Sequence, residues 1–177
     1  MLRRLAAGDL HAFQGYRHDA KVQRYQGWQP LQDSDALAFL EEMATAPLFQ
    51  RGQWVQIGIA DARGGALIGD IGICTSADGE SAEIGFTVCP QSQGRGHGTD
   101  AVGQAIRLLF ECTAAARIVG VADSRNSASI RLLERVGMRR VATRHTVFNG
   151  EPCIEHTYAV SRHDGGCRPD REEVRME

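Results

Sequence analysis

The chain has 177 residues, of which 42% are hydrophobic and 24% charged, values that fit one ordinary globular domain. A formal net charge of −2 argues against nucleic acid as a stable partner. The absence of an apolar run of about 18 residues excludes a membrane-spanning helix. The first residues do not resemble a signal peptide, so we expect a cytoplasmic protein. The five scattered cysteines form no C-x-x-C pair, and we expect neither a metal site nor a disulfide framework.

The first half of the chain predicts helices followed by an antiparallel meander. Apolar residues at helical spacing indicate a helix over residues 10–25, interrupted near His18, and a second helix with Ser34 as its N-cap. Alternating apolar residues then predict three strands, at residues 54–60, 66–73 and 82–88.

The second half predicts a strand between two helices and a closing hairpin. A helix is expected over 99–112 and another over 127–136, ending at Gly137. The nearly continuous apolar run at 117–122 is typical of a strand buried on both faces. A hairpin follows, at residues 139–148 and 153–160. The order predicts a single-domain α/β fold, residues 1–163, with a mixed sheet that is antiparallel first and parallel at its centre. We expect residues 164–177 to form a flexible charged tail.

A glycine-rich loop connects the strand at 82–88 to the helix at 99–112. Glycines at 94, 96 and 98 allow successive backbone N–H groups to turn toward one anion, and the helix N-terminus adds a partial positive charge. The loop therefore fits a phosphate or a pyrophosphate. An ordinary flexible surface loop is the alternative.

The same loop also matches a dinucleotide-binding fingerprint. Gly96-His-Gly98-Thr-Asp-Ala101 fits G-x-G-x-x-G/A, and Asp123 follows about twenty residues later. Against this interpretation, the glycines begin several residues after the strand, the preceding half is a meander, and too few residues follow for the rest of such a fold. An NAD(P)-linked oxidoreductase is therefore kept as a secondary alternative.

Two motifs resemble those of the GNAT superfamily of N-acetyltransferases, in particular the branch that acetylates ribosomal-protein N-termini. Gln93-Gly-Arg-Gly-His-Gly98 matches the coenzyme motif Q/R-x-x-G-x-G/A. The segment from Asn126 to Met138 looks like N-x-x-S-x-x-L-x-x-x-x-G-F, with Met138 in place of the aromatic residue. The resemblance implies acetyl-CoA as the co-substrate and a central parallel strand pair that splays around it. The residues it implies for coenzyme binding are Val88, Gln93, Gly94, Arg95, Gly96, His97, Gly98, Thr99 and Asn126.

Acetyl transfer to an amine needs a neutral amine and a stabilised leaving thiolate. Glu83 is the candidate base, because family members often place one on this strand; a solvent-facing carboxylate is the alternative. His97, His145 and His156 have suitable intrinsic pKa values but are expected at the surface.

Many family members stabilise the thiolate with a tyrosine seven residues after the asparagine, where this chain has Leu133. The resemblance implies Ser129 as the donor instead. The alternative for Ser129 is a helix residue that bonds its own backbone. For Asn126, the role of helix N-cap fits as well as that of a coenzyme contact.

Tyr25 and Trp28 are expected to wall the acceptor site. The predicted function is an N-acetyltransferase acting on a primary amine, either a protein N-terminus or a small amine, by direct attack in a ternary complex. A non-catalytic acyl-CoA-binding module is the main alternative. The sequence leaves both a monomer and a homodimer open.

Overall fold

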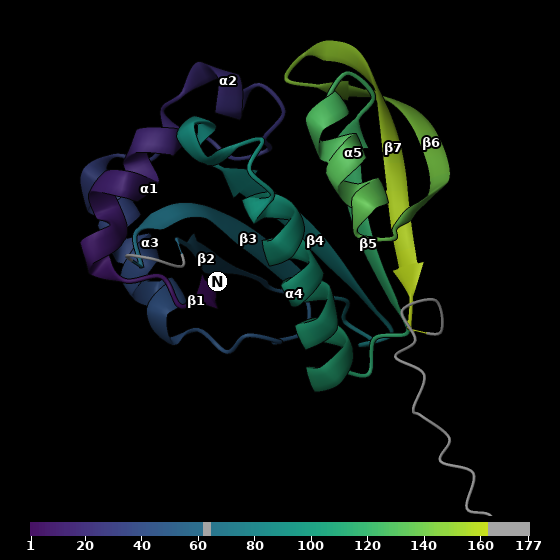
Figure 1. Ribbon diagram of the computed structural model, residues 1–177, viewed down its shortest axis with the longest axis horizontal. Helices are drawn as coiled ribbons and strands as arrows, with labels where there is room; N and C mark the ends of the chain where they lie inside the picture. The colour runs from purple at the N-terminus through teal and green to yellow at the C-terminus, as the bar shows by residue number, and fades with distance from the viewer. Residues whose placement is uncertain (62–64, 163–177) are drawn as a thin grey trace, which may run out of the picture.

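A computed structural model describes residues 1–61 and 65–162. Its centre is a seven-stranded sheet in the order β1-β2-β3-β4-β5-β7-β6 (Figure 1). Neighbouring strands run antiparallel except β4 and β5, which are parallel. The strands are β1 (Leu2–Arg3), β2 (Trp54–Ala60), β3 (Leu67–Thr75), β4 (Ser81–Val88), β5 (Arg117–Asp123), β6 (Arg139–Phe148) and β7 (Glu151–Ser161). The mixed α/β fold predicted from the sequence is thus confirmed, whereas the predicted tail lies outside the described residues.

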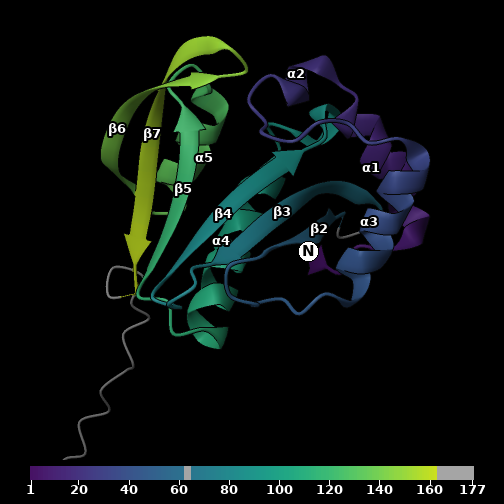
Figure 2. The same ribbon diagram turned by 180° about the vertical axis from the view of Figure 1, so that it is seen from behind.

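Helices cover the two faces of this sheet (Figures 1 and 2). Helices α4 and α5 lie on one face, and α1 and α3 lie on the other, beside β2 and β3. The helices are η1 (Ala7–Asp9), α1 (Leu10–Arg17), α2 (Ala20–Gln23), α3 (Asp33–Thr45), η2 (Pro90–Ser92), α4 (His97–Cys112) and α5 (Ser127–Arg135). Within the described residues, none of these helices is long and apolar enough to cross a membrane.

Two apolar clusters hold the layers together. In the larger one, Ile71 and Ile73 of β3 pack with Val102 and Leu109 of α4, and all four are at most 1% exposed. The smaller cluster joins α1 and α3 and includes Phe13, Leu40 and Met43. Strand β3 contributes to both clusters, because Leu67 at its start belongs to the smaller one.

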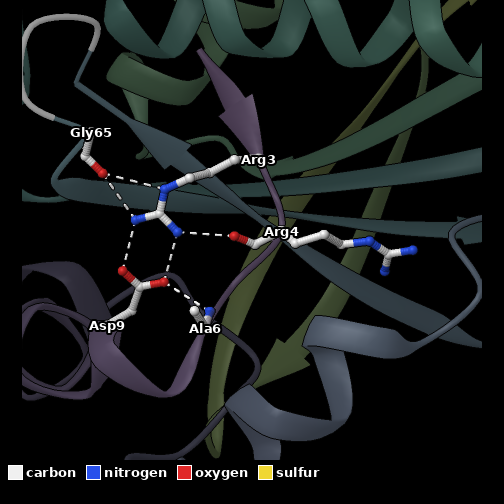
Figure 3. Close-up of polar contacts among 5 residues, drawn as sticks. All are labelled: Arg3, Arg4, Ala6, Asp9 and Gly65. Atoms are coloured by element: carbon white, nitrogen blue, oxygen red, sulfur yellow. Dashed lines mark hydrogen bonds and ion pairs between the residues drawn. The ribbon is translucent and has the colours of Figure 1, made fainter.

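An ion pair fastens the N-terminal strand to the rest of the fold (Figure 3). Both terminal nitrogens of Arg3 donate to the Asp9 carboxylate at 2.7 Å, and Arg3 also donates to the carbonyl oxygen of Gly65. The hydrogen bond from Arg3, despite the opposing effect of burial, lowers the pKa of Asp9. This contact ties β1, the start of α1 and the turn before β3 to one another.

The parallel pair is short, and this creates space beside it. Along the parallel pair, Ser81 of β4 is opposite Arg117 of β5, Ala82 is opposite Ile118, and Glu83 is opposite Val119. Beyond these residues the two strands diverge (Figure 2). The helix α2 lies over the wide end of this opening. The sheet is therefore split at its centre, as the resemblance implied.

Several element boundaries differ from the sequence prediction. The first helix is interrupted at the predicted place, between α1 and α2. Helix α3 begins at Asp33, with Gln32 rather than Ser34 as its N-cap, and no side chain caps it. Helix α4 begins at His97, because Gly96 in the left-handed region ends the loop.

The prediction that the strand at 117–122 is buried on both faces was wrong. Its exposure alternates along the chain, and Val121 is 44% exposed. Helix α5 covers one face of β5, whereas Val121, on the other face, is exposed. A mostly apolar strand composition therefore does not require two covered faces.

Candidate active site

A cavity of about 380 Å³ lies where β4 and β5 diverge. Its walls are the end of β4, the glycine loop with the start of α4, the helix α5, and α2 with the segment that follows it. Seven of the residues implied for coenzyme binding line it: Val88, Gln93, Gly94, Gly96, Gly98, Thr99 and Asn126. The structure therefore brings together two motifs that are separated in the sequence.

The backbone of the glycine loop is shaped for close approach by a ligand. Gly94 and Gly96 have φ angles of +72° and +88°, and a Cβ built on either would meet no protein atom within 4 Å. A glycine is needed at position 98 for a different reason. A Cβ there would lie 2.9 Å from Leu132 Cδ1 and 3.3 Å from Val88 Cγ2. Gly98 thus allows α4 to pack closely on α5 and β4, while the first two keep the loop open.

This loop presents hydrogen-bond donors to the cavity. Helix α4 starts directly after Gly96, and the first N–H groups of an α-helix have no partner within the helix. Together with the partial positive charge of the helix N-terminus, they favour an anionic ligand. The Gln93 side chain donates to the carbonyl oxygen of Val88 at 2.8 Å and holds the start of the loop against the strand. These features fit the pyrophosphate of a coenzyme.

Arg95 and His97 are outside the set of residues that line the cavity. Arg95 is exposed at the tip of the loop, and His97 is the first residue of α4. Their predicted coenzyme contacts stay predictions.

Asn126 and Ser129 lie on the α5 side of the cavity. The side-chain oxygen of Asn126 accepts a hydrogen bond from the Ser129 backbone N–H at 3.2 Å, so Asn126 caps α5 and lines the cavity at once. Ser129 also lines the cavity. Leu133, one turn further on, is 1% exposed and packs against Gly120 of β5. The position that often holds a tyrosine therefore belongs to the core here.

Glu83 lies outside the cavity lining, at the point where β4 and β5 part. It is the last β4 residue in register with β5, opposite Val119, and its side chain is half-buried. Burial, and secondly the neighbouring Glu155 carboxylate, raise the pKa of Glu83 above its ordinary value. A carboxylate with a raised pKa is a better proton acceptor for an amine near neutral pH. Glu83 thus has the environment of a general base.

The two predicted acceptor residues have different places. Tyr25 lines the cavity. Trp28 lies outside the lining and stacks on the Arg17 guanidinium, whose Cζ is 4.2 Å from the centre of the indole ring. His145 and His156 lie in the β6–β7 hairpin, where His156 is 3.1 Å from the Thr143 hydroxyl.

Sequence reasoning missed three cationic residues of the cavity wall. Lys21 comes from α2, and Arg131 and Arg135 come from α5. On α5 a signal was available, because Ala128, Leu132 and the two arginines follow the spacing of one helix face. Lys21 gave no comparable signal, since only the tertiary fold brings α2 over the cavity. These cations make the cavity mouth attractive to phosphate groups.

Comparison with known families agrees with this geometry. Residues 1–139 match the family model of the acetyltransferase (GNAT) domain. The chain belongs to the GNAT acetyltransferase family. It is therefore an acetyl-CoA-dependent acyltransferase, and the oxidoreductase alternative is set aside.

Similar proteins extend over most of the chain. An uncharacterized N-acetyltransferase, YoaA of Bacillus subtilis, is 26% identical over 164 residues, which cover 90% of this chain and 92% of that protein. A GNAT acetyltransferase from Bacillus anthracis superposes with a TM-score of 0.79 at 21% identity, over 90% of this chain and 93% of the other. Spermidine N-acetyltransferase from Vibrio cholerae, solved with CoA and spermine, has a TM-score of 0.78 at 20% identity, over 93% and 96%. These two structures share the fold of this GNAT protein.

Proposed function

We propose that this protein is an N-acetyltransferase that moves the acetyl group of acetyl-CoA to a primary amine by direct attack in a ternary complex. One arrangement carries the proposal: the glycine loop and the start of α4 line the cavity, and a half-buried glutamate lies where β4 and β5 part. Glu83 and Val88 are five residues apart on one strand, or about 17 Å. A long coenzyme can therefore have its phosphates and its acyl end at separate places along β4.

The phosphate end would be held by backbone and by cations. A Cβ on Gly94 or Gly96 would have no protein atom within 4 Å, so a ligand has room to approach this backbone, and the cavity wall also carries Lys21, Arg131 and Arg135. Backbone donors and cations are the groups that proteins use to bind phosphates. Acetyl-CoA, when bound, supplies an acyl group activated as a thioester.

The amine would be deprotonated by Glu83. A protein amine has a pKa of about 8 to 10 and is mostly protonated at neutral pH, so it cannot attack until it loses a proton. Glu83 accepts this proton before the attack. The nitrogen loses a second proton as it bonds to the acyl carbon; this proton passes to the departing sulfur as the carbon–sulfur bond breaks, and Ser129 donates a hydrogen bond to that sulfur. The lining position of Ser129 supports this second role.

Acidic side chains beside Glu83 support a cationic acceptor. Glu83 is opposite Val119 on β5, and Asp123, four residues further along β5, is opposite Glu155 on β7. Because side chains alternate along a strand, the three carboxyl groups share one face of the sheet, the face left uncovered around Val121. Arg125 and Arg144 pair with Asp123 and Glu155 at 2.7 Å, which leaves Glu83 as the carboxylate of this set without an ion pair among the described residues.

A polyamine is therefore the acceptor that we test first, and the relative solved with spermine supports that choice. The assay measures thiol release from acetyl-CoA with each of three acceptors: spermidine, a peptide with a free N-terminus, and a monoamine that carries no second charged group. Release that depends on the amine is expected, with spermidine preferred. Tight acetyl-CoA binding without thiol release for any amine would instead indicate a non-catalytic binding module.

A further inference from the structure

A buried ion pair joins the end of α1 to β3, and the proposed chemistry makes no use of it. Asp70 is 2% exposed and Arg17 is 5% exposed. Arg17 Nη2 donates to Asp70 Oδ2 at 3.1 Å, and the Tyr16 hydroxyl donates to the same oxygen at 2.5 Å. Apolar side chains of similar volume often stabilise a core as well as a buried ion pair does. The pair therefore calls for a role beyond attaching α1 to the sheet.

Arg17 also holds a segment beyond its own helix. Its guanidinium lies between aromatic rings, 4.4 Å from the centre of Phe13 and 4.2 Å from that of Trp28. The contact with Trp28 closes the base of residues 18–27, which we call the α2 loop. The Gln23 side chain, from the middle of the α2 loop, donates to the Arg17 backbone carbonyl oxygen at 2.9 Å. The Arg17 side chain thus joins the residue before the α2 loop to Trp28, the residue after it.

The α2 loop is a wall of the cavity. Its lining residues are Lys21, Val22, Tyr25 and Gln26, and all four lie between the two ends that Arg17 holds. Gln26 donates across to the carbonyl oxygen of Phe86 on β4 at 3.3 Å. A shift at the base of the α2 loop would therefore move a phosphate-facing cation and an aromatic ring together.

We propose that Arg17, held by Asp70 and stacked on Trp28, is a positioning residue that sets the α2 loop against the ligand cavity. The identity of the ligand, acetyl-CoA with its amine, rests on the proposed function. Asp70 is outside the cavity lining, but its register partner Thr87 on β4 belongs to it, so the Trp28 variants, which leave β3 and β4 unchanged, test the path through Arg17 most directly. The same arrangement gives Trp28 a role that needs no contact with the acceptor.

The first test is limited trypsin digestion of the ligand-free protein, because Lys21 and Arg24 are exposed in the α2 loop. Asp70→Asn and Trp28→Ala should raise cleavage at these two sites about tenfold, as expected for a segment released from its anchors. Trp28→Phe keeps a ring for stacking and should restore the slow rate. Mass spectrometry of the new chain ends identifies the sites.

Two controls separate positioning from a general loss of stability. Tyr16→Phe removes the other hydrogen bond to the same Asp70 oxygen but leaves Arg17 in place. Trp54→Ala alters the second tryptophan, which is 47% exposed on β2 and outside the cavity lining. Both controls should leave cleavage within about twofold of wild type, since neither removes a contact of Arg17 with Asp70 or Trp28.

Binding is the second test. Asp70→Asn and Trp28→Ala should weaken acetyl-CoA binding about tenfold, since the competent loop position becomes a minor state. Unchanged cleavage and affinity in both variants would overturn the proposal. A raised amine KM in Trp28→Ala alone, with normal cleavage, would also overturn it and would assign Trp28 to the acceptor. If Asp70→Asn does not fold, the Trp28→Ala and Trp28→Phe pair decides. Failure of wild type to bind acetyl-CoA would refute the proposed function, whereas the digestion would still judge the role of Arg17.

Discussion

Replacing Gly96 with alanine should weaken acetyl-CoA binding in addition to its cost to the stability of the fold. Gly96 has a φ of +88°, and a Cβ there would meet no protein atom within 4 Å. Alanine at this position therefore encounters no clash, and its cost is the left-handed conformation, roughly 1–2 kcal/mol. The added methyl group occupies the open space through which the loop amides approach a phosphate. We expect the dissociation constant of acetyl-CoA to rise at least about tenfold, or about 1.4 kcal/mol.

Gly137 provides a matched control for this substitution. It also has a φ of +88° with no atom within 4 Å of its Cβ position, but it follows α5 and lies outside the cavity lining. Gly137→Ala should therefore lower the free energy of unfolding as much as Gly96→Ala does and leave acetyl-CoA affinity unchanged. Urea denaturation and titration calorimetry measure the two quantities. Equal affinities for the two variants would refute the assignment of the loop.

Three further predictions concern single side chains. Ser129→Ala should lower kcat about 30- to 900-fold, equivalent to about 2–4 kcal/mol, with little change in acetyl-CoA affinity. Ser127 is exposed on the same helix, and Ser127→Ala should match wild type in steady-state kinetics. Burial raises the pKa of Glu83, so wild-type activity should rise with pH as this carboxyl loses its proton. The Glu83→Gln variant should lack that rise and should be about 10- to 1000-fold slower. A pH–rate profile that the substitution leaves unchanged would place the base elsewhere. The hydrogen bond from Arg3 lowers the pKa of Asp9, so the stabilisation by Asp9 is complete above the unfolded pKa of about 3.9 and is lost as pH falls through the folded value. Asp9→Asn should remove that part of the acid dependence of the unfolding free energy, and an identical dependence in denaturation experiments would contradict this contribution.

Local patterns in the sequence were enough to predict most of the fold. The alternation of apolar residues in β2, β3 and β4 and the helical spacing in α4 and α5 reflect burial, which the sequence records directly. Boundaries were less accurate where the backbone alone ends an element. Gly96 starts α4 through its left-handed conformation, and Gln32 precedes α3 without a side-chain cap, so neither gives a strong signal.

The site could be predicted in part. Motif spacing predicted the glycine loop and Asn126, because both act through residues close to them in the sequence. The position of the α2 loop, which carries Lys21 and is held by the Arg17–Trp28 contact, depends on how α1 packs against β3, and no local sequence pattern encodes that packing. The uncovered face around Val121 was missed for the same reason, because burial of a strand depends on which helices reach it.

Hydrogen–deuterium exchange with and without acetyl-CoA tests most directly where the coenzyme binds. We expect slower amide exchange in the glycine loop at 93–99 and at the start of α5, and also in the α2 loop, when acetyl-CoA is added. Exchange in β6 should not change, because no β6 residue lines the cavity. Protection confined to the β6–β7 hairpin, with unchanged exchange at 93–99 and at the start of α5, would contradict the placement of acetyl-CoA between β4 and β5.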